Sequence, residues 1–289
     1  MPVTVFAPLL YLFAGFLLGK SRLNVKASAS TLLTRLIIPL VIIFNIATHP
    51  PGVFVVIGGI MVVMSLMLVI SRLVTKDPVQ NLCFCYLNIG WLGLPVASSL
   101  FGNGAAMIFI AAYVGSSLFG NSVGVGLLVK GADLRTRIRE TLKAPPVWSL
   151  AAGILLSPFS DVIASQGHAA YAVLKFLMSF TGMAILGIWL SETPVRVSDF
   201  RQALLPFIGK ALGLFVLLSG FIVVCMQWQI ELVSQNRIAL YMICLLPPAA
   251  NIVVLETHYL QTGRSASMIA CGTVLSIIAV AIYALCVLL

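Results

Sequence analysis

The amino-acid sequence predicts an all-α, polytopic membrane protein with ten transmembrane helices, arranged as two inverted five-helix repeats. Three observations support this prediction. Of the 289 residues, 61% are hydrophobic and 9% are charged, whereas about 25% of the residues of an ordinary soluble domain are charged. The apolar residues form ten stretches of about 20 residues, the length of a helix that crosses a bilayer. Two of these stretches, in corresponding positions of the two halves, contain helix-breaking residues.

We expect the ten spans to cover residues 3–19, 30–48, 52–73, 79–102, 104–129, 146–164, 169–190, 202–226, 237–259 and 265–289. The connections between them are short, so no separate soluble domain is expected. The N-terminus lacks the basic region of a signal peptide and is interpreted as the start of the first span. All six cysteines lie in apolar stretches and are expected to be packing residues rather than disulfide partners or metal ligands.

The basic residues of the connections predict the orientation, because cytoplasmic connections carry the excess of Lys and Arg. The connections after the odd-numbered spans carry thirteen basic residues: Lys20, Arg22, Lys26, Arg72, Lys76, Lys130, Arg135, Arg137, Arg139, Lys143, Arg196, Arg201 and Arg264. The other connections carry only Arg237. We therefore expect a protein of the cytoplasmic membrane with both termini outside. The net charge of +9 is interpreted as attraction to an anionic membrane face, and no nucleic-acid partner is expected.

A polar linker, residues 131–145, separates the predicted repeats 1–130 and 146–289. Its sequence GADLRTRIRETLK predicts a short amphipathic helix on the inner membrane surface. The alternative is a solvated linker. Because each repeat contains five spans, the second repeat enters the membrane in the opposite direction. The broken fourth span then corresponds to the broken ninth span.

Asparagine, glycine and proline interrupt these two spans. The residues are Asn88, Gly90, Gly93 and Pro95 in the fourth span, and Pro247, Pro248 and Asn251 in the ninth. Proline removes a backbone donor from a helix, and lipid cannot satisfy the groups that are freed. Paired interruptions of this kind mark the binding site of many secondary transporters. We therefore expect the two broken helices to cross near the midplane of the bilayer.

Two half-helices would begin at this crossing, and their N-terminal N–H groups suit a carboxylate. The amides of Asn88 and Asn251 could add donors without adding charge. The alternative is that each asparagine only satisfies backbone groups at its own kink. Gly90 and Gly93 could admit a substrate to the backbone, or could equally let neighbouring helices pack closely.

Several ionisable residues within the spans are candidates for a coupling or charge role. Lys175 is placed near the outer surface, and Glu256 and His258 end the ninth span on the cytoplasmic side. The alternatives are snorkelling for Lys175 and a polar helix end for the other two. Lys210 and Arg35 are expected to snorkel to the inner surface. The coupling ion, H⁺ or Na⁺, stays open. No catalytic motif, phosphate loop or metal-ligand set is present, so we expect neither an enzyme nor a cofactor.

Three stretches carry a resemblance to a known family: NIGWLGLPVASSLFG (Asn88 to Gly102), PPAANIVVLETHY (Pro247 to Tyr259) and STLLTRLIIPLVIIFNI (Ser30 to Ile46). They resemble the auxin efflux carrier, or PIN-like, family, whose bacterial members include malonate and malate permeases. The resemblance covers nearly the whole chain. The long central loop of the plant carriers is absent, and two prolines stand in the ninth span where one would be expected.

The resemblance implies a scaffold built from residues 3–48 and 146–190, which can form a homodimer. It also implies a moving transport unit built from residues 52–130 and 202–289. A small organic anion would bind at the crossing near Pro95 and Pro248, and Asn88 matches the family's asparagine in the fourth span.

We therefore expect a secondary transporter that moves a mono- or dicarboxylate by alternating access. The alternatives are a sodium-coupled carrier of the bile-acid type and, less favoured, a channel or sensor with the same helical plan. A channel should show rings of charge or a repeated filter sequence, and neither is evident. Substrate identity, direction of transport and oligomeric state do not follow from the sequence.

Overall fold

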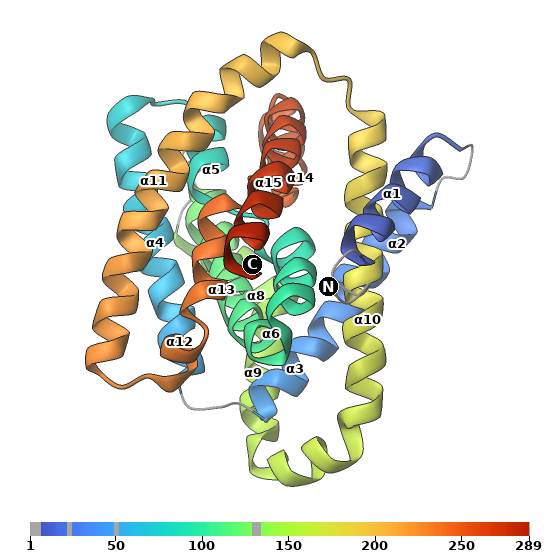
Figure 1. Ribbon diagram of the computed structural model, residues 1–289, viewed down its shortest axis with the longest axis vertical. Helices are drawn as coiled ribbons and strands as arrows, with labels where there is room; N and C mark the ends of the chain where they lie inside the picture. Colours follow the sequence, from blue (N-terminus) through green and yellow to red (C-terminus); the bar gives the residue numbers. More distant parts are fainter. Residues whose placement is uncertain (1–6, 22–24, 49–51, 129–133, 289) are drawn as a thin grey trace.

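The computed structural model describes residues 7–21, 25–48, 52–128 and 134–288 (Figure 1). Within them the chain is helical and forms no strand beyond one isolated β-bridge. Six helical segments are long and apolar enough to cross a membrane, which makes this an all-α protein of the membrane type. The prediction of ten crossings in two inverted repeats stays a prediction.

The elements of the first half are α1 (Ala7–Gly19), α2 (Lys26–Leu32), η2 (Leu33–Ile37), α3 (Ile38–Ala47), α4 (Val53–Val74), α5 (Pro78–Cys85), η3 (Ile89–Gly93), α6 (Leu94–Phe119), η4 (Gly120–Gly124) and α7 (Val125–Leu128). Residues 3–6 of the first predicted span lie outside the described residues. The helix α6 contains a turn at Gly102, where φ is +80°, a value that favours glycine. This turn lies where the sequence predicts the end of the fourth span.

The elements of the second half are α8 (Leu134–Lys143), α9 (Pro145–Leu156), η5 (Ser157–Phe159), α10 (Ser160–Glu192), α11 (Val197–Gln227), α12 (Glu231–Gln235), α13 (Arg237–Tyr241), η6 (Met242–Leu245), α14 (Asn251–Leu260) and α15 (Ser265–Leu288). The helix α8 falls within the predicted amphipathic linker, and its Ile138 and Leu142 side chains are exposed.

The boundary between the sixth and seventh predicted spans is wrong. We expected it between residues 164 and 169, where polar residues interrupt the apolar pattern. The chain instead turns at Ser157–Phe159, and α10 runs unbroken through the polar residues. Pro158 accounts for the turn, because proline lacks the N–H that would continue α9. The polar residues Ser165 and His168 lie within α10, so polarity alone was a misleading signal.

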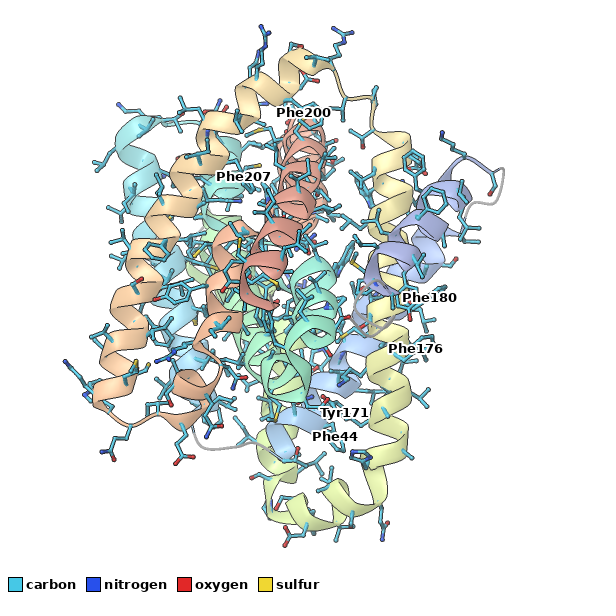
Figure 2. All side chains as sticks on the ribbon, viewed as in Figure 1. Phe44, Tyr171, Phe176, Phe180, Phe200 and Phe207 are labelled. Carbon is cyan, nitrogen blue, oxygen red and sulfur yellow. The ribbon has the colours of Figure 1, made fainter. Side chains whose placement is uncertain are left out.

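The helices α1, α3, α9 and α10 pack against one another. The closest approach joins α1 and α10: a Cβ atom added at Gly15 would lie 2.0 Å from the carbonyl oxygen of Ala184. Such close backbone contact is typical of helix pairs in membranes. Between α3 and α10 the rings of Phe44 and Tyr171 stack, with centroids 4.2 Å apart (Figure 2). The Tyr171 hydroxyl also hydrogen-bonds to the Asn45 amide.

The remaining long helices form a second set of contacts, in which α4 packs against α5, α6 and α11, and α11 packs against α15. Figure 1 shows α4 and α11 at one edge of the view, α1, α2 and α10 at the other, and α5, α6 and α13 to α15 between them. Large apolar side chains are exposed along α1, α4, α10 and α11. Exposed apolar surface of this extent suits contact with lipid.

Candidate functional site: the crossing of two broken helices

The first break lies at Tyr86–Asn88, between α5 and η3. The helix α5 ends at Cys85, and Tyr86 is extended, with ψ of 114°. The helix then resumes at Ile89, and the Asn88 side-chain oxygen accepts a hydrogen bond from the backbone N–H of Trp91 at 3.2 Å. Asparagine is a favoured N-cap because its short side chain can satisfy an otherwise unpaired N–H. Asn88 therefore starts the second half-helix.

Pro95 does not lie at this break, which corrects the sequence prediction. It is the second residue of α6 and is buried, seven positions after Asn88. The helix that contains Pro95 starts at Ile89, so Pro95 lies in its second turn, where a proline removes a helical hydrogen bond. The helix passes through this point with a short π-type segment, η3, which precedes Pro95.

The second break lies between η6 and α14, where Leu246 is extended and Pro247 and Pro248 follow. The helix resumes at Asn251. Here the prolines do lie in the break, as the sequence predicts. Neither proline can donate a backbone hydrogen bond, so the segment cannot continue the preceding helix.

The two breaks meet and pair in antiparallel fashion, with a β-bridge between Leu87 and Pro248. The backbone N–H of Asn88 donates to the carbonyl oxygen of Pro247 at 2.9 Å, and the N–H of Ala249 donates to the carbonyl oxygen of Tyr86 at 2.9 Å. Each break thus satisfies backbone groups of the other, which is what an irregular segment at membrane depth requires.

The two asparagines belong to this crossing but serve it differently. The Asn88 side chain is 4% exposed, and its amide nitrogen has no hydrogen-bond partner among the described residues. The Asn251 side chain lies beside the Tyr86 hydroxyl. Sequence reasoning missed Tyr86, although its place two residues before Asn88 was a usable signal. At the crossing, therefore, the buried Asn88 amide forms a hydrogen bond through its oxygen but none through its nitrogen.

Side chains of neighbouring residues pack against Gly90 and Gly93, the two glycines of the predicted fourth span. A Cβ atom at Gly90 would lie 2.5 Å from the Tyr113 ring, and one at Gly93 would lie 2.7 Å from Leu246 and 3.0 Å from Phe109. In this structure both glycines admit neighbouring side chains rather than expose backbone. A direct substrate contact at either position stays a prediction.

Lys210 does not snorkel, which is the second correction at this site. It lies near the middle of α11, about 20 Å along the axis from Val197 at the usual helical rise. Its side chain is 3% exposed, and its ammonium group donates to the carbonyl oxygen of Leu246, at the second break. The ring of Phe207, labelled in Figure 2, lies 4.6 Å from the ammonium nitrogen.

Lys175 is half-buried on α10. It donates to the side-chain oxygen of Asn103, next to the Gly102 turn, at 2.7 Å. This bond joins the α1–α3–α9–α10 group to α6, on the opposite side of the crossing from the ends of α10 and α14.

Glu256 is fully buried, and its carboxylate accepts hydrogen bonds from the backbone N–H groups of Arg264 at 2.9 Å and Ser265 at 2.8 Å. Together with the Thr262 hydroxyl, these contacts cap the N-terminus of α15. His258 is exposed and packs edge-on against Tyr259. These contacts match the interpretation of a polar helix end for both residues.

A narrow groove reaches the crossing between α10 on one side and α14 and α15 on the other. Its lining includes Trp189 of α10, Thr193 directly after α10, Ala250 at the second break, and Ile269 of α15. A larger hollow is formed by α8 alone, around Ile138 and Leu142, away from the crossing.

No protein-family model and no curated protein sequence matches this chain.

Proposed function

We propose that the protein is a secondary transporter that moves a small organic anion, a mono- or dicarboxylate, across the cytoplasmic membrane by alternating access. The observation that carries this proposal is the backbone pairing of two broken helices around a buried amide with a free donor. The pairing satisfies backbone groups of both breaks, whereas the buried amide nitrogen of Asn88 has no partner among the described residues, which is costly unless a ligand uses it.

The charge pattern of the crossing favours an anion. Two helical segments, η3–α6 and α14, begin there and direct the positive ends of their dipoles toward it. The free N–H₂ group of Asn88 adds a neutral donor. No carboxylate of the described residues lies in the crossing: Glu256 caps α15, and Asp77 pairs with Arg264 at 2.9 Å.

The contacts around the crossing fit one state of an alternating-access cycle. On one side, Lys175 bonds to Asn103, and the backbone of Gly182 lies close to that of Trp91. On the other side the groove between α10 and α14–α15 reaches Ala250. We infer that the structure is closed on the Lys175 side and that the other side would open along this narrow groove.

The ion pairs support the proposed orientation. Lys26 pairs with Glu192, and Arg264 pairs with Asp77. Each ion pair joins two connections that follow odd-numbered predicted spans. The two connections of each pair therefore lie on the same side of the membrane. The excess of basic residues in these connections favours a cytoplasmic location for that side, so the groove would face the cytoplasm. We further propose that the apolar outer faces of α1 and α10 contact lipid or a second copy of the chain.

The experiment is a measurement of ligand-dependent thermal stability on purified protein, with acetate, malonate and malate as probes. A ligand that binds the native state raises the unfolding midpoint. We expect at least one carboxylate to stabilise the wild-type protein and to bind Asn88→Ser about tenfold more weakly, because serine keeps the N-cap but lacks the free N–H₂ group. Lys175→Gln is the control and should bind normally. A wild-type protein that none of the carboxylates stabilises, or an Asn88→Ser protein that binds like wild type, would contradict the proposal.

A further inference from the structure

A buried charged side chain from α11 contacts the second break, and the proposed anion site does not explain it. Lys210 is buried near the middle of α11, and its ammonium group donates to the carbonyl oxygen of Leu246. Leu246 is the residue before Pro247, whose own carbonyl accepts the N–H of Asn88. The ammonium group therefore lies one residue from the backbone pairing of the two breaks.

The groups around Lys210 come from α5 and η6, the helical segments that precede the two breaks. The thiols of Cys83 on α5 and Cys244 on η6 are its titratable neighbours. Both lie within two residues of the end of their helix, since α5 ends at Cys85 and η6 ends at Leu245. Among the described residues no carboxylate forms an ion pair with Lys210. The ammonium group thus contacts the carbonyl that follows η6 and an aromatic ring, the C-terminal turn of α5 lies nearby, and no acid of the described residues pairs with it.

Helix C-termini explain how a lone ammonium group can be held there. The unpaired carbonyls at the end of a helix amount to about half a negative charge, and they favour a cation. The ring of Phe207 adds a second, weaker attraction. In carriers with broken helices, unwound carbonyls and half-helix C-termini are the groups that coordinate a coupling sodium ion. At this crossing the ammonium group of Lys210 binds a carbonyl of this kind, that of Leu246.

We propose that Lys210 is a tethered cation that takes the place of a coupling sodium ion at the crossing, so that organic-anion binding needs the charge at position 210 and does not need sodium. The anion would lie at the positive ends of η3 and α14, and Lys210 neutralises the negative ends of α5 and η6. This inference rests on the proposed function for the anion, but its first test uses no anion.

The first test compares unfolding midpoints of purified, ligand-free protein in NaCl, KCl and choline chloride at equal ionic strength. The wild-type midpoint should be the same in all three salts. Lys210→Ala should unfold about 5 °C lower in choline chloride, and NaCl should restore part of that loss, because the carbonyls are left without a cation. Lys210→Arg keeps the charge and should show no sodium response.

Lys175→Gln is the matched control, because it removes a half-buried lysine away from the two helix C-termini, and its midpoint should not depend on sodium. If Lys210→Ala does not fold, Lys210→Gln, which keeps a donor for Leu246 and lacks the charge, replaces it. A sodium response of the wild-type protein, or no sodium response in the uncharged variant, would overturn the proposal.

The second test repeats anion binding with the carboxylate that stabilises the wild-type protein most. Wild-type affinity should be the same in NaCl and choline chloride. Lys210→Gln should bind about tenfold more weakly in choline chloride and recover in NaCl. Equal affinity of Lys210→Gln and wild type in choline chloride would overturn the proposal. If no carboxylate binds the wild-type protein, the proposed function fails, while the ligand-free comparison still decides the role of Lys210.

Discussion

The two breaks of this protein interrupt their helices by different means. The first break contains no proline: Tyr86 and Leu87 are extended, and Asn88 caps the helix that follows. The second break contains Pro247 and Pro248, and a buried lysine contacts the carbonyl oxygen that precedes them. The two segments nevertheless pair with each other, because each supplies backbone hydrogen-bond partners to the other.

The difference shows that a break does not require a proline. Pro95 lies within the second half-helix, while the first break lies where an asparagine cap and a partner strand are both available. The second break follows from its own sequence, because Pro247 and Pro248 are consecutive and neither has a backbone N–H to donate to a helix. We therefore expect the second break to be the template on which the first break forms.

The largest effect should come from removing that template. In the Pro247→Ala/Pro248→Ala double variant, each substitution removes a penalty of about 3 kcal/mol against helix. A continuous helix from α13 to α14 then competes with the crossing. We expect normal insertion into the membrane and a loss of transport of more than about 100-fold, measured as carboxylate uptake into proteoliposomes at matched protein content. Near-normal uptake would mean that the pairing with Tyr86–Asn88 alone maintains the second break.

A smaller effect should come from Glu256, which ties the half-helix after the second break to α15. Glu256→Gln removes the charge from a buried acceptor of three hydrogen bonds, and we expect a loss of about 1–3 kcal/mol in the free energy of unfolding. Anion affinity should not change. The exposed neighbour His258→Ala is the control and should change neither quantity. A variant of Glu256 with normal stability and altered transport would reassign this residue from helix capping to coupling.

The smallest effect should come from Pro95→Ala. Pro95 lies inside the helix that starts at Ile89, directly after the π-type segment η3, so alanine fits there and should change the free energy of unfolding by less than about 1 kcal/mol, mostly through a more flexible unfolded chain. Uptake should stay within about twofold of wild type. A loss of uptake as large as that of the double variant at the second break would show that the first break also depends on its proline.

Much of the fold could be predicted from the sequence, because the dominant signal was the alternation of apolar stretches with short connections. The limits of Val53–Val74 lie within one residue of the predicted span 52–73, whereas α11 begins at Val197, five residues before the predicted start of the eighth span at 202. The turn at Ser157–Phe159 was missed, because it lies inside an apolar stretch, where hydropathy carries no information. The all-α membrane class was therefore predictable, while the number of crossings is still a prediction.

Less of the candidate site could be predicted, because its geometry depends on contacts between distant segments. Asn88 and the prolines of the second break were found from local helix-breaking chemistry. Tyr86 was missed, because its place two residues before Asn88 puts it near the break but only packing shows that its hydroxyl lies beside Asn251. Lys210 was read as a snorkelling residue, because its distance from the helix end suggested an escape to the surface, and only packing shows that it meets Leu246. Such residues are invisible until the two halves of the chain are placed together.

The most direct test of the central claim, that the crossing holds the anion, is a double-mutant cycle on Asn88 and Asn251. Carboxylate affinity is measured for purified wild type, Asn88→Ala, Asn251→Ala and the double variant. Each single substitution should weaken binding by about 10- to 100-fold, since a hydrogen bond to a charged group contributes about 1.5–3 kcal/mol. The double variant should fall short of additive, because both side chains serve one ligand. If both single variants bind normally while Lys175→Gln does not, the anion binds near Asn103 instead, and the crossing serves the structure alone.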